Sequence, residues 1–271
     1  MTDTKLPPLL LVGCGKMGGA MLAGWLEQGL TQAVVVEPHA ASAAVFASRV
    51  TVVPNADAIP AGFTPGVIVL AIKPQEAAAT LPHYARFAAA GALTVSIMAG
   101  RNVAGMQALL GAGAAVVRAM PNTPAAVRQG YTCCHASLGV TPAQRALADR
   151  LLTAVGLVDW VEDEALIDPV TAVSGGGPAY VFLLAEVLEA AAIEQGLPPA
   201  LARRMARATV SGSGALLAAS TEDSAQLRKN VTSPKGTTER ALGVLMAPDA
   251  WPKLMSEAIA AATARSRELA G

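Results

Sequence analysis

The sequence has little charge and little cysteine. Only 15% of its 271 residues are charged, and 20 basic residues balance 20 acidic ones, so the formal net charge is zero. A neutral chain offers no basic face to a phosphate backbone, and we expect no nucleic-acid partner. The three cysteines, Cys14, Cys133 and Cys134, have neither metal-site spacing nor the even number of a disulfide framework. They indicate reduced thiols in a cytoplasmic protein.

Other classes of protein are also disfavoured. The most apolar helical stretch, residues 179–193, carries Glu186 and Glu189 and is too short to cross a bilayer, so we expect no membrane partner. The polar residues 1–5 are not typical of a secretory signal. The three histidines form no triad or metal spacing, and no carboxylate pair indicates glycosidase chemistry. We therefore expect no metal, and chemistry that comes from an organic cofactor.

Apolar residues are in excess. Hydrophobic residues make up 53% of the chain, and the mean hydropathy is +0.44. With so little charge, this composition suggests a surface that is buried against other copies of the chain. A well-filled large core is the competing explanation.

Strand and helix patterns alternate up to about residue 162, which predicts an α/β domain with a parallel sheet covered on both faces. The expected strands are 9–12, 33–36, 50–53, 67–72, 93–98, 115–119, 131–135 and 157–161. The expected helices between them are 16–28, 75–88, 102–110 and 142–155. This N-terminal part, residues 1–162, is predicted to be a Rossmann-type dinucleotide-binding domain.

Strand patterns stop after residue 163. Helices are expected over 164–173, 179–195, 198–219, 237–246 and 250–269. The helix at 179–195 is apolar nearly all round, so more than one neighbour must cover it. Residues 163–271 are therefore predicted to be an all-helical domain that dimerises.

A glycine-rich turn follows the first strand. The motif G-x-G-x-x-G comprises Gly13, Cys14, Gly15, Lys16, Met17 and Gly18, and it lies between an apolar run and a helical pattern. In that context the motif predicts dinucleotide binding, although a glycine turn in another α/β protein is an alternative. Glu37 ends the second strand nineteen residues beyond Gly18, where an acid can bind a ribose 2′-hydroxyl.

Ligands of an open parallel sheet bind beyond the carboxyl ends of its strands. Small, polar or proline-locked residues occupy those positions here, including Asn55, Lys73-Pro74 and Asn122. Lys73 could face the cofactor's ribose or phosphate, or donate a proton, or be a solvated residue at a strand end. Asn122 lies between two prolines, which favours an ordered position over a plain turn.

A small, hydroxyl-rich loop near the C-terminus, residues 230–236, runs into a helix. Gly236 has no side chain to block a ligand and cannot supply the hydroxyl of a capping box. The first-turn amides have no intrahelical partners, and the helix dipole favours an anion there. The loop is therefore predicted to hold a carboxylate or phosphate.

These segments together resemble the pyrroline-5-carboxylate reductase family. The matching stretches are Gly13–Gly18, Ala71–Pro74, Met120–Pro124, Ser174–Tyr180 and Val231–Thr238. They occur in the family's order and cover nearly the whole chain. Two positions depart from the family pattern: Lys235 stands where glycine is usual, and Gly176 where serine is common.

The resemblance implies reduction of 1-pyrroline-5-carboxylate to L-proline with NADPH or NADH. It implies that Thr238 bonds the imine nitrogen, and that the loop of Ser233, Gly236, Thr237 and Thr238 binds the substrate, its amides holding the carboxylate. Asn55, Ala71, Ile72, Lys73, Pro74, Asn122 and Asn230 are expected to line the cofactor. The resemblance also implies a homodimer through the helical domain, a site that combines two subunits, and in many members a ring of dimers.

Glu37 conflicts with use of NADPH, because a carboxylate beside the 2′-position repels the phosphate. We therefore expect NADH to be well used. The alternative is that Glu37 points away and leaves His39 or Arg49 to meet the phosphate.

Two other functions compete with this interpretation. A β-hydroxyacid dehydrogenase has a catalytic lysine in the helix after its glycine-rich loop, whereas no lysine follows Ser174–Gly177 in the next helix. A nucleotide-sensing or structural protein could keep the fold without activity, but its 233–238 loop would be damaged.

Overall fold

The computed structural model describes residues 5–270 and divides them into two compact units. The first unit comprises residues up to Gly175 together with the C-terminal residues from Ala262, and the second comprises Gly176–Ala261. The expectation about the N-terminal segment falls mainly on residues 1–4, which lie outside the described residues. The expected division at residues 162 and 163 marks the end of the last strand, whereas the chain leaves the first unit at Gly175.

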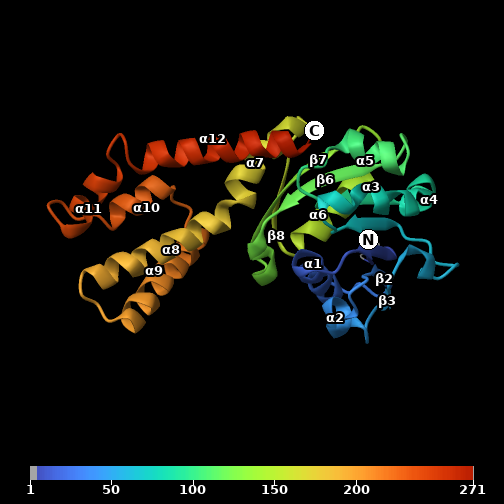
Figure 1. Cartoon of the computed structure of the whole chain (residues 1–271), viewed down its shortest axis with the longest axis horizontal. Coiled ribbons are helices and arrows are strands. Elements are labelled where there is room, and N and C mark those ends of the chain that lie inside the picture. The colour runs from blue at the N-terminus through green and yellow to red at the C-terminus, as the bar shows by residue number, and fades with distance from the viewer. Residues whose placement is uncertain (1–4, 271) are drawn as a thin grey trace. The chain divides into compact units, whose positions relative to one another are not determined.

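The first unit contains an eight-stranded sheet (Figure 1). Its strand order is β3-β2-β1-β4-β5-β6-β7-β8. The strands are β1 Leu9–Val12, β2 Ala33–Val36, β3 Thr51–Val53, β4 Val67–Leu70, β5 Leu93–Ser96, β6 Val116–Pro121, β7 Gly130–Ala136 and β8 Gly156–Trp160. Every neighbouring pair is parallel except β6 and β7. The predicted class, a Rossmann-type sheet followed by helices, is confirmed.

The sheet departs from the predicted parallel arrangement at β7, because β7 and its parallel neighbour β8 run opposite to the other six strands. Only residues 122–129 connect β6 to β7, and they include the 3₁₀ turn Thr123–Val127. A parallel crossover needs a dozen or more residues, so a connection of this length returns the chain in the opposite direction.

Both faces of the sheet are covered. Alternate residues of β1 point to opposite faces, so Leu9 and Leu11 belong to one core and Leu10 and Val12 to the other. The first core takes most of its helical residues from α1 (Lys16–Glu27) and α6 (Pro142–Thr153). The second takes them from the helical turns 77–89 and from α5 (Val103–Leu110).

The helix expected over 75–88 is broken into four pieces. They are the 3₁₀ turn Pro74–Glu76, α3 Ala77–Thr80, the 3₁₀ turn Leu81–Tyr84 and α4 Ala85–Ala89. Pro82 lies in the third piece, where it has no amide to donate and its ring crowds the preceding turn. Short helices at Ala40–Ala43 (α2), and 3₁₀ turns at Ala44–Phe46 and Ala56–Ala58, were not expected.

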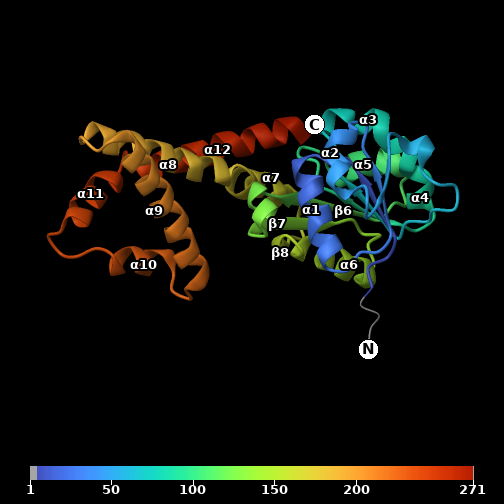
Figure 2. The same cartoon turned by 90° about the horizontal axis from the view of Figure 1, so that it is seen from below.

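The second unit is helical, as predicted. Its helices are α8 Gly177–Glu194, α9 Pro199–Ala219, α10 Ser224–Asn230, α11 Thr237–Leu245 and the first part of α12 Trp251–Ala270. The helices α8 and α9 contact each other and cross at an angle in the view of Figure 2. The short helix α10 was not expected, and Asp223 caps it by accepting a hydrogen bond from the Gln226 amide at 2.8 Å.

One helical run is longer than expected. The chain continues from α7 (Ile167–Val170) through a π-helical turn, Thr171–Gly175, into α8. By length and composition the run Glu164–Glu194 is apolar enough to cross a membrane, and its most apolar window is not buried within the chain. The prediction that the apolar stretch is too short to cross a bilayer is therefore wrong on length. The π-helical turn Thr171–Gly175 joins α7 to α8, so the helical run is longer than residues 179–193.

The contribution of one buried hydrogen bond to the stability of the first unit can be tested at Trp25. Its Nε1 donates to the Leu151 carbonyl at 2.7 Å and joins α1 to α6. In a Trp25→Phe variant the carbonyl loses its partner, so we expect the free energy of unfolding to fall by about 1–3 kcal/mol. Trp160→Phe is the matched control, since its partner Asp149 is only partly buried. Chemical denaturation of both variants measures the difference, and equal losses would contradict the expectation.

Candidate active site

The chain changes direction across the sheet at β1. This strand pairs with both β2 and β4, so connections to either side diverge from its carboxyl end. A groove of about 570 Å³ lies there. It is lined by Val12, Gly13, Gly15, Val36, Glu37, Pro38, His39, Pro54, Asn55, Ala56, Asp57, Ala71, Ile72, Lys73, Glu76, Ala79, Thr80, His83 and Tyr84. A groove at a topological switch point is where this class of fold binds nucleotides.

The glycine-rich turn packs tightly on one side and is open on the other. Gly13 has φ +90°, and a Cβ there would lie 2.6 Å from the Ala71 carbonyl oxygen. A Cβ on Gly18 would lie 2.4 Å from the Gly13 carbonyl oxygen, whereas one on Gly15 would meet nothing within 4 Å. Gly15 is the N-cap of α1 and makes no side-chain cap. The open face and first-turn amides can therefore receive a pyrophosphate.

Glu37 is buried and held by two backbone amides. Its Oε2 accepts a hydrogen bond from the Cys14 amide at 2.7 Å, and its Oε1 accepts one from the His39 amide at 2.9 Å. The carboxylate thus joins the glycine-rich turn to the end of β2 and also lines the groove. The Glu37 carboxylate therefore faces the groove, and His39, one of the two cations considered for a 2′-phosphate, lines it as well. Arg49, the other cation considered there, donates to the Leu26 carbonyl at 2.9 Å and is not a lining residue.

The side chain of Cys14 does not take part in this groove. Burial, and secondarily the Glu37 charge, raises the pKa of the Cys14 thiol to about 11. The group is therefore a neutral thiol at physiological pH. Cys14 contributes through its amide, and Lys16, Met17 and Gly18 lie in the first turn of α1 outside the lining.

Most residues predicted at the strand ends line the groove, but two asparagines serve other contacts. Asn55 lines the groove and caps the 3₁₀ turn Ala56–Ala58 through the Ala58 amide at 3.1 Å. Asn122 lies outside the lining. It accepts a hydrogen bond from the Tyr131 amide at 2.9 Å and donates to Ser174 Oγ at 3.2 Å. Pro74 begins the turn after Lys73 and is also outside the lining.

Sequence reasoning missed the lining residues that come from the broken helix after β4. They are Glu76, Ala79, Thr80, His83 and Tyr84. The sequence pattern predicts one regular helix here, and a 3.6-residue period does not indicate which face a kinked segment turns to the groove. The kink at Pro82 was the available signal. Burial raises the pKa of Tyr84 to about 12.

The second unit contains the hydroxyl-rich loop. Gly236 is the N-cap of α11 and makes no side-chain cap, which confirms the predicted absence of a capping box. Glu239 reaches back past Gly236 and accepts a hydrogen bond from the Lys235 amide at 2.8 Å. The side chains of Ser233 and Thr237 are exposed, and Thr238 is half-buried. This helix start can bind an anion through its amides.

Asn230 ends α10 just before this loop. Its Nδ2 donates to Glu222 at 3.0 Å, and its Oδ1 accepts from Gln226 Nε2 at 2.7 Å. Both ends of the amide therefore have partners within the second unit, and they fix where the loop begins.

The described residues hold no metal-binding cluster of three or more His, Cys, Asp or Glu side chains. The helix after Ser174–Gly177 is α8, and it contains no lysine. The described residues thus present a groove whose shape suits a dinucleotide and a helix start that can receive an anion, and α8 lacks the lysine of a β-hydroxyacid dehydrogenase.

Comparison with known proteins gives matches along the whole chain. The family model for pyrroline-5-carboxylate reductase dimerisation matches residues 164–269, and that for coenzyme F420-dependent NADP oxidoreductases matches residues 9–100. A pyrroline-5-carboxylate reductase of Pseudomonas aeruginosa is 40% identical over 97% of each chain. One from Synechocystis is 37% identical over 96% of this chain and 97% of its own.

Solved structures agree with these matches. The structure of a pyrroline-5-carboxylate reductase from Coxiella burnetii has a TM-score of 0.91 at 31% identity, covering 99% of this chain and all of its own. A Plasmodium falciparum pyrroline carboxylate reductase, solved with NADP bound, has a TM-score of 0.84 at 24% identity over 99% of this chain and 100% of its own, and supports the fold. With relatives this similar over nearly its full length, the chain belongs to the pyrroline-5-carboxylate reductase family.

Proposed function

We propose that this protein reduces 1-pyrroline-5-carboxylate to L-proline with a nicotinamide cofactor. The observation that carries the proposal is the match over 97% of the chain to a relative named for this activity, with both candidate binding elements intact. The nicotinamide cofactor, NADPH or NADH, supplies the hydride when bound.

The groove in the first unit fits a dinucleotide. The open face at Gly15 and the uncapped start of α1 suit a pyrophosphate, and the buried Glu37 carboxylate can accept from ribose hydroxyls. Residues that would hold the group are Gly13–Gly18, Glu37, Asn55, Ala71, Ile72, Lys73 and Pro74. We retain Asn122 and Asn230 as proposed cofactor residues, although the contacts described above already occupy their side chains.

The loop in the second unit is proposed to bind the substrate. The amides of Gly236, Thr237 and Thr238 hold its carboxylate, and the Ser233 hydroxyl adds a donor. The Thr238 hydroxyl orients the imine nitrogen. A protonated C=N bond is already electrophilic, so the main contribution of these residues is to hold the imine carbon at reacting distance.

Removing the Thr238 hydroxyl tests the proposed reaction most directly. Thr238→Ala removes the group that orients the nitrogen, so we expect kcat to fall about 10- to 100-fold, equivalent to about 1.4–2.8 kcal/mol. Cofactor affinity should stay within about twofold, because this hydroxyl is assigned to the substrate. Steady-state assays and NADH titration measure both quantities. Thr221→Ala, in the exposed turn before α10, is the control. Unchanged turnover in Thr238→Ala would remove Thr238 from its role.

Cofactor preference follows from the two bonds that hold Glu37. The carboxylate cannot turn away without leaving the Cys14 and His39 amides unpaired, so a 2′-phosphate would meet its charge. We therefore propose that NADH is used at least as well as NADPH. Glu37→Gln removes the charge and should raise kcat/KM for NADPH about tenfold relative to NADH. A wild-type protein with strong NADPH preference would contradict the proposal.

The helical unit is proposed to form a homodimer. Large hydrophobic side chains are exposed on α8, α9 and α12, including Phe182, Leu183, Val187, Leu216 and Leu254. An apolar groove of about 410 Å³ lies between α8 and α12 within this unit. The dimerisation model covers these helices, and homo-oligomerisation accounts for their exposure. The same surface accounts for the apolar run Glu164–Glu194 without a membrane.

Charge placed on this surface should dissociate the dimer. Leu183→Glu and Val187→Asp each put a carboxylate where an apolar partner is expected. Sedimentation equilibrium should then show the monomer mass, whereas Val45→Asp, at an exposed site in the first unit, should leave the dimer intact. A ring of dimers would be seen in the wild-type protein as a multiple of the dimer mass. Monomeric wild-type protein would overturn this assignment.

We place the enzyme in the cytoplasm. Its three cysteines are free and buried, as expected where thiols stay reduced. Its zero net charge supports a small-molecule substrate rather than nucleic acid.

A further inference from the structure

The end of α12 packs against the first unit through polar contacts. From Ala262 onward the helix groups with the sheet domain. The buried side chains of this segment are Thr263 and Ser266, and Ser266 Oγ donates to Asp168 Oδ1 at 2.8 Å. Small polar side chains bury little apolar area, so specific hydrogen bonds rather than an apolar seam hold the segment.

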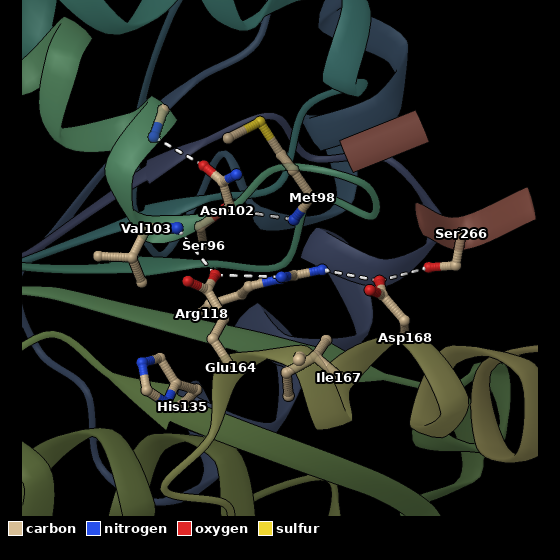
Figure 3. A network of polar contacts seen from close by, with 12 residues as sticks. Ser96, Met98, Asn102, Val103, Arg118, His135, Glu164, Ile167, Asp168 and Ser266 are labelled. Carbon is tan, nitrogen blue, oxygen red and sulfur yellow. Dashed lines mark hydrogen bonds and ion pairs between the residues drawn. The ribbon is translucent and has the colours of Figure 1, made fainter. Parts of the chain in front are cut away.

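Asp168 connects this segment to a buried arginine (Figure 3). Its Oδ1 lies 3.7 Å from Arg118 Nη2, and Arg118 is only 4% exposed. The other terminal nitrogen of the guanidinium, Nη1, lies 3.0 Å from Glu164 Oε1. That oxygen also accepts a hydrogen bond from the Val103 amide at 2.8 Å. A buried guanidinium with two carboxylate partners fixes the elements that carry them.

Val103 begins α5, so the network reaches the loop 97–102 that joins β5 to α5. Within this loop Arg101 Nε donates to the Pro74 carbonyl at 3.1 Å. The loop therefore connects the Glu164 end of the network to the segment after β4, where Lys73 lines the cofactor groove.

The C-terminal segment also touches the middle of this loop directly. Gly100 has φ +67°, and a Cβ there would lie 3.1 Å from Leu269 Cβ and 3.2 Å from its carbonyl oxygen. Any side chain at position 100 would therefore displace the end of α12 or strain the loop. The loop is held by Leu269 on one side and by the Arg118 network at its end.

The strand that the loop 97–102 follows indicates which part of the cofactor the loop borders. The described groove is lined by segments that follow β1, β2, β3 and β4. In the order 3-2-1-4-5-6, the second half of a dinucleotide lies beyond the carboxyl ends of β4, β5 and β6. The loop 97–102 follows β5 and therefore borders the half that receives the nicotinamide.

We propose that the C-terminal segment, residues 262–269, positions the loop 97–102 for the nicotinamide end of the cofactor. Ser266 and Asp168 are positioning residues, since they act through Arg118, Glu164 and the loop rather than by contact with the cofactor. The inference rests on the proposed function only in that it needs a nicotinamide cofactor.

Two ligands distinguish positioning from general stability. NADH fills both halves of the groove, whereas ADP-ribose lacks the nicotinamide. In Ser266→Ala, Asp168 loses its hydroxyl donor, and we expect the Kd for NADH to rise at least about fivefold. The Kd for ADP-ribose should stay within about twofold, because most of the lining that it contacts comes from the segments after β1, β2 and β3, whereas the loop's hydrogen bond reaches only the segment after β4. Isothermal calorimetry measures both.

Gly100→Ala is the second variant and changes the loop side of the contact with Leu269. It should likewise raise the Kd for NADH while leaving the Kd for ADP-ribose within about twofold. Ser266→Thr keeps the hydroxyl and should restore NADH affinity, while Arg267→Ala, exposed on the same turn, should change neither ligand. Equal losses for both ligands, or no loss in either variant, would overturn the inference. A wild-type protein that binds NADH but does not reduce 1-pyrroline-5-carboxylate would refute the proposed function alone.

Discussion

Unsatisfied amides at helix starts are the interaction on which both candidate binding elements depend. The helices α5, α6 and α10 begin at Asn102, Thr141 and Asp223, whose side chains accept from their own first turns. By contrast, α1 begins at Gly15 and α11 at Gly236, and neither has a side-chain cap. The helices α8 and α9 also lack one, but each has a proline in its first turn, which leaves one amide fewer to satisfy. With glycine at the N-cap, such a start sacrifices only about a few tenths of a kcal/mol of local stability relative to a good cap. That sacrifice is understandable where an anionic ligand replaces the missing cap.

Elements with a strong local pattern could be predicted from the sequence. The strands β1 and β2 were predicted to the residue, because each is an apolar run that ends in a polar or glycine residue. The direction of β7 was not predictable from its own residues, since a strand reads the same in either direction. It depends on the length of the β6–β7 connection, which is too short for a parallel crossover. The break at Pro82 could be predicted from the proline itself, but the helical period of the apolar residues around it favours one continuous helix.

Site residues divide in the same way. The turn Gly13–Gly18 and the loop before α11 carry local signals, because glycine and hydroxyl residues at fixed spacing have few other uses. The Arg118 network carries none: its partners Glu164, Asp168 and Ser266 are distant in sequence and become neighbours only through the fold. For Glu37 the sequence left two orientations open, and only the positions of the Cys14 and His39 amides decide between them.

Lys235 shows how a departure from a family pattern can leave the local shape unchanged. Its φ is +61°, in the left-handed region that glycine occupies without strain, which explains why glycine is usual there. A lysine in that conformation costs about 1 kcal/mol. The hydrogen bond from its amide to Glu239 Oε2 offsets part of that cost and holds the turn. Because the backbone keeps the conformation that glycine would adopt, Gly236 and the amides after it stay at an open helix start. The substitution therefore adds a positive charge beside the proposed anion site without closing it.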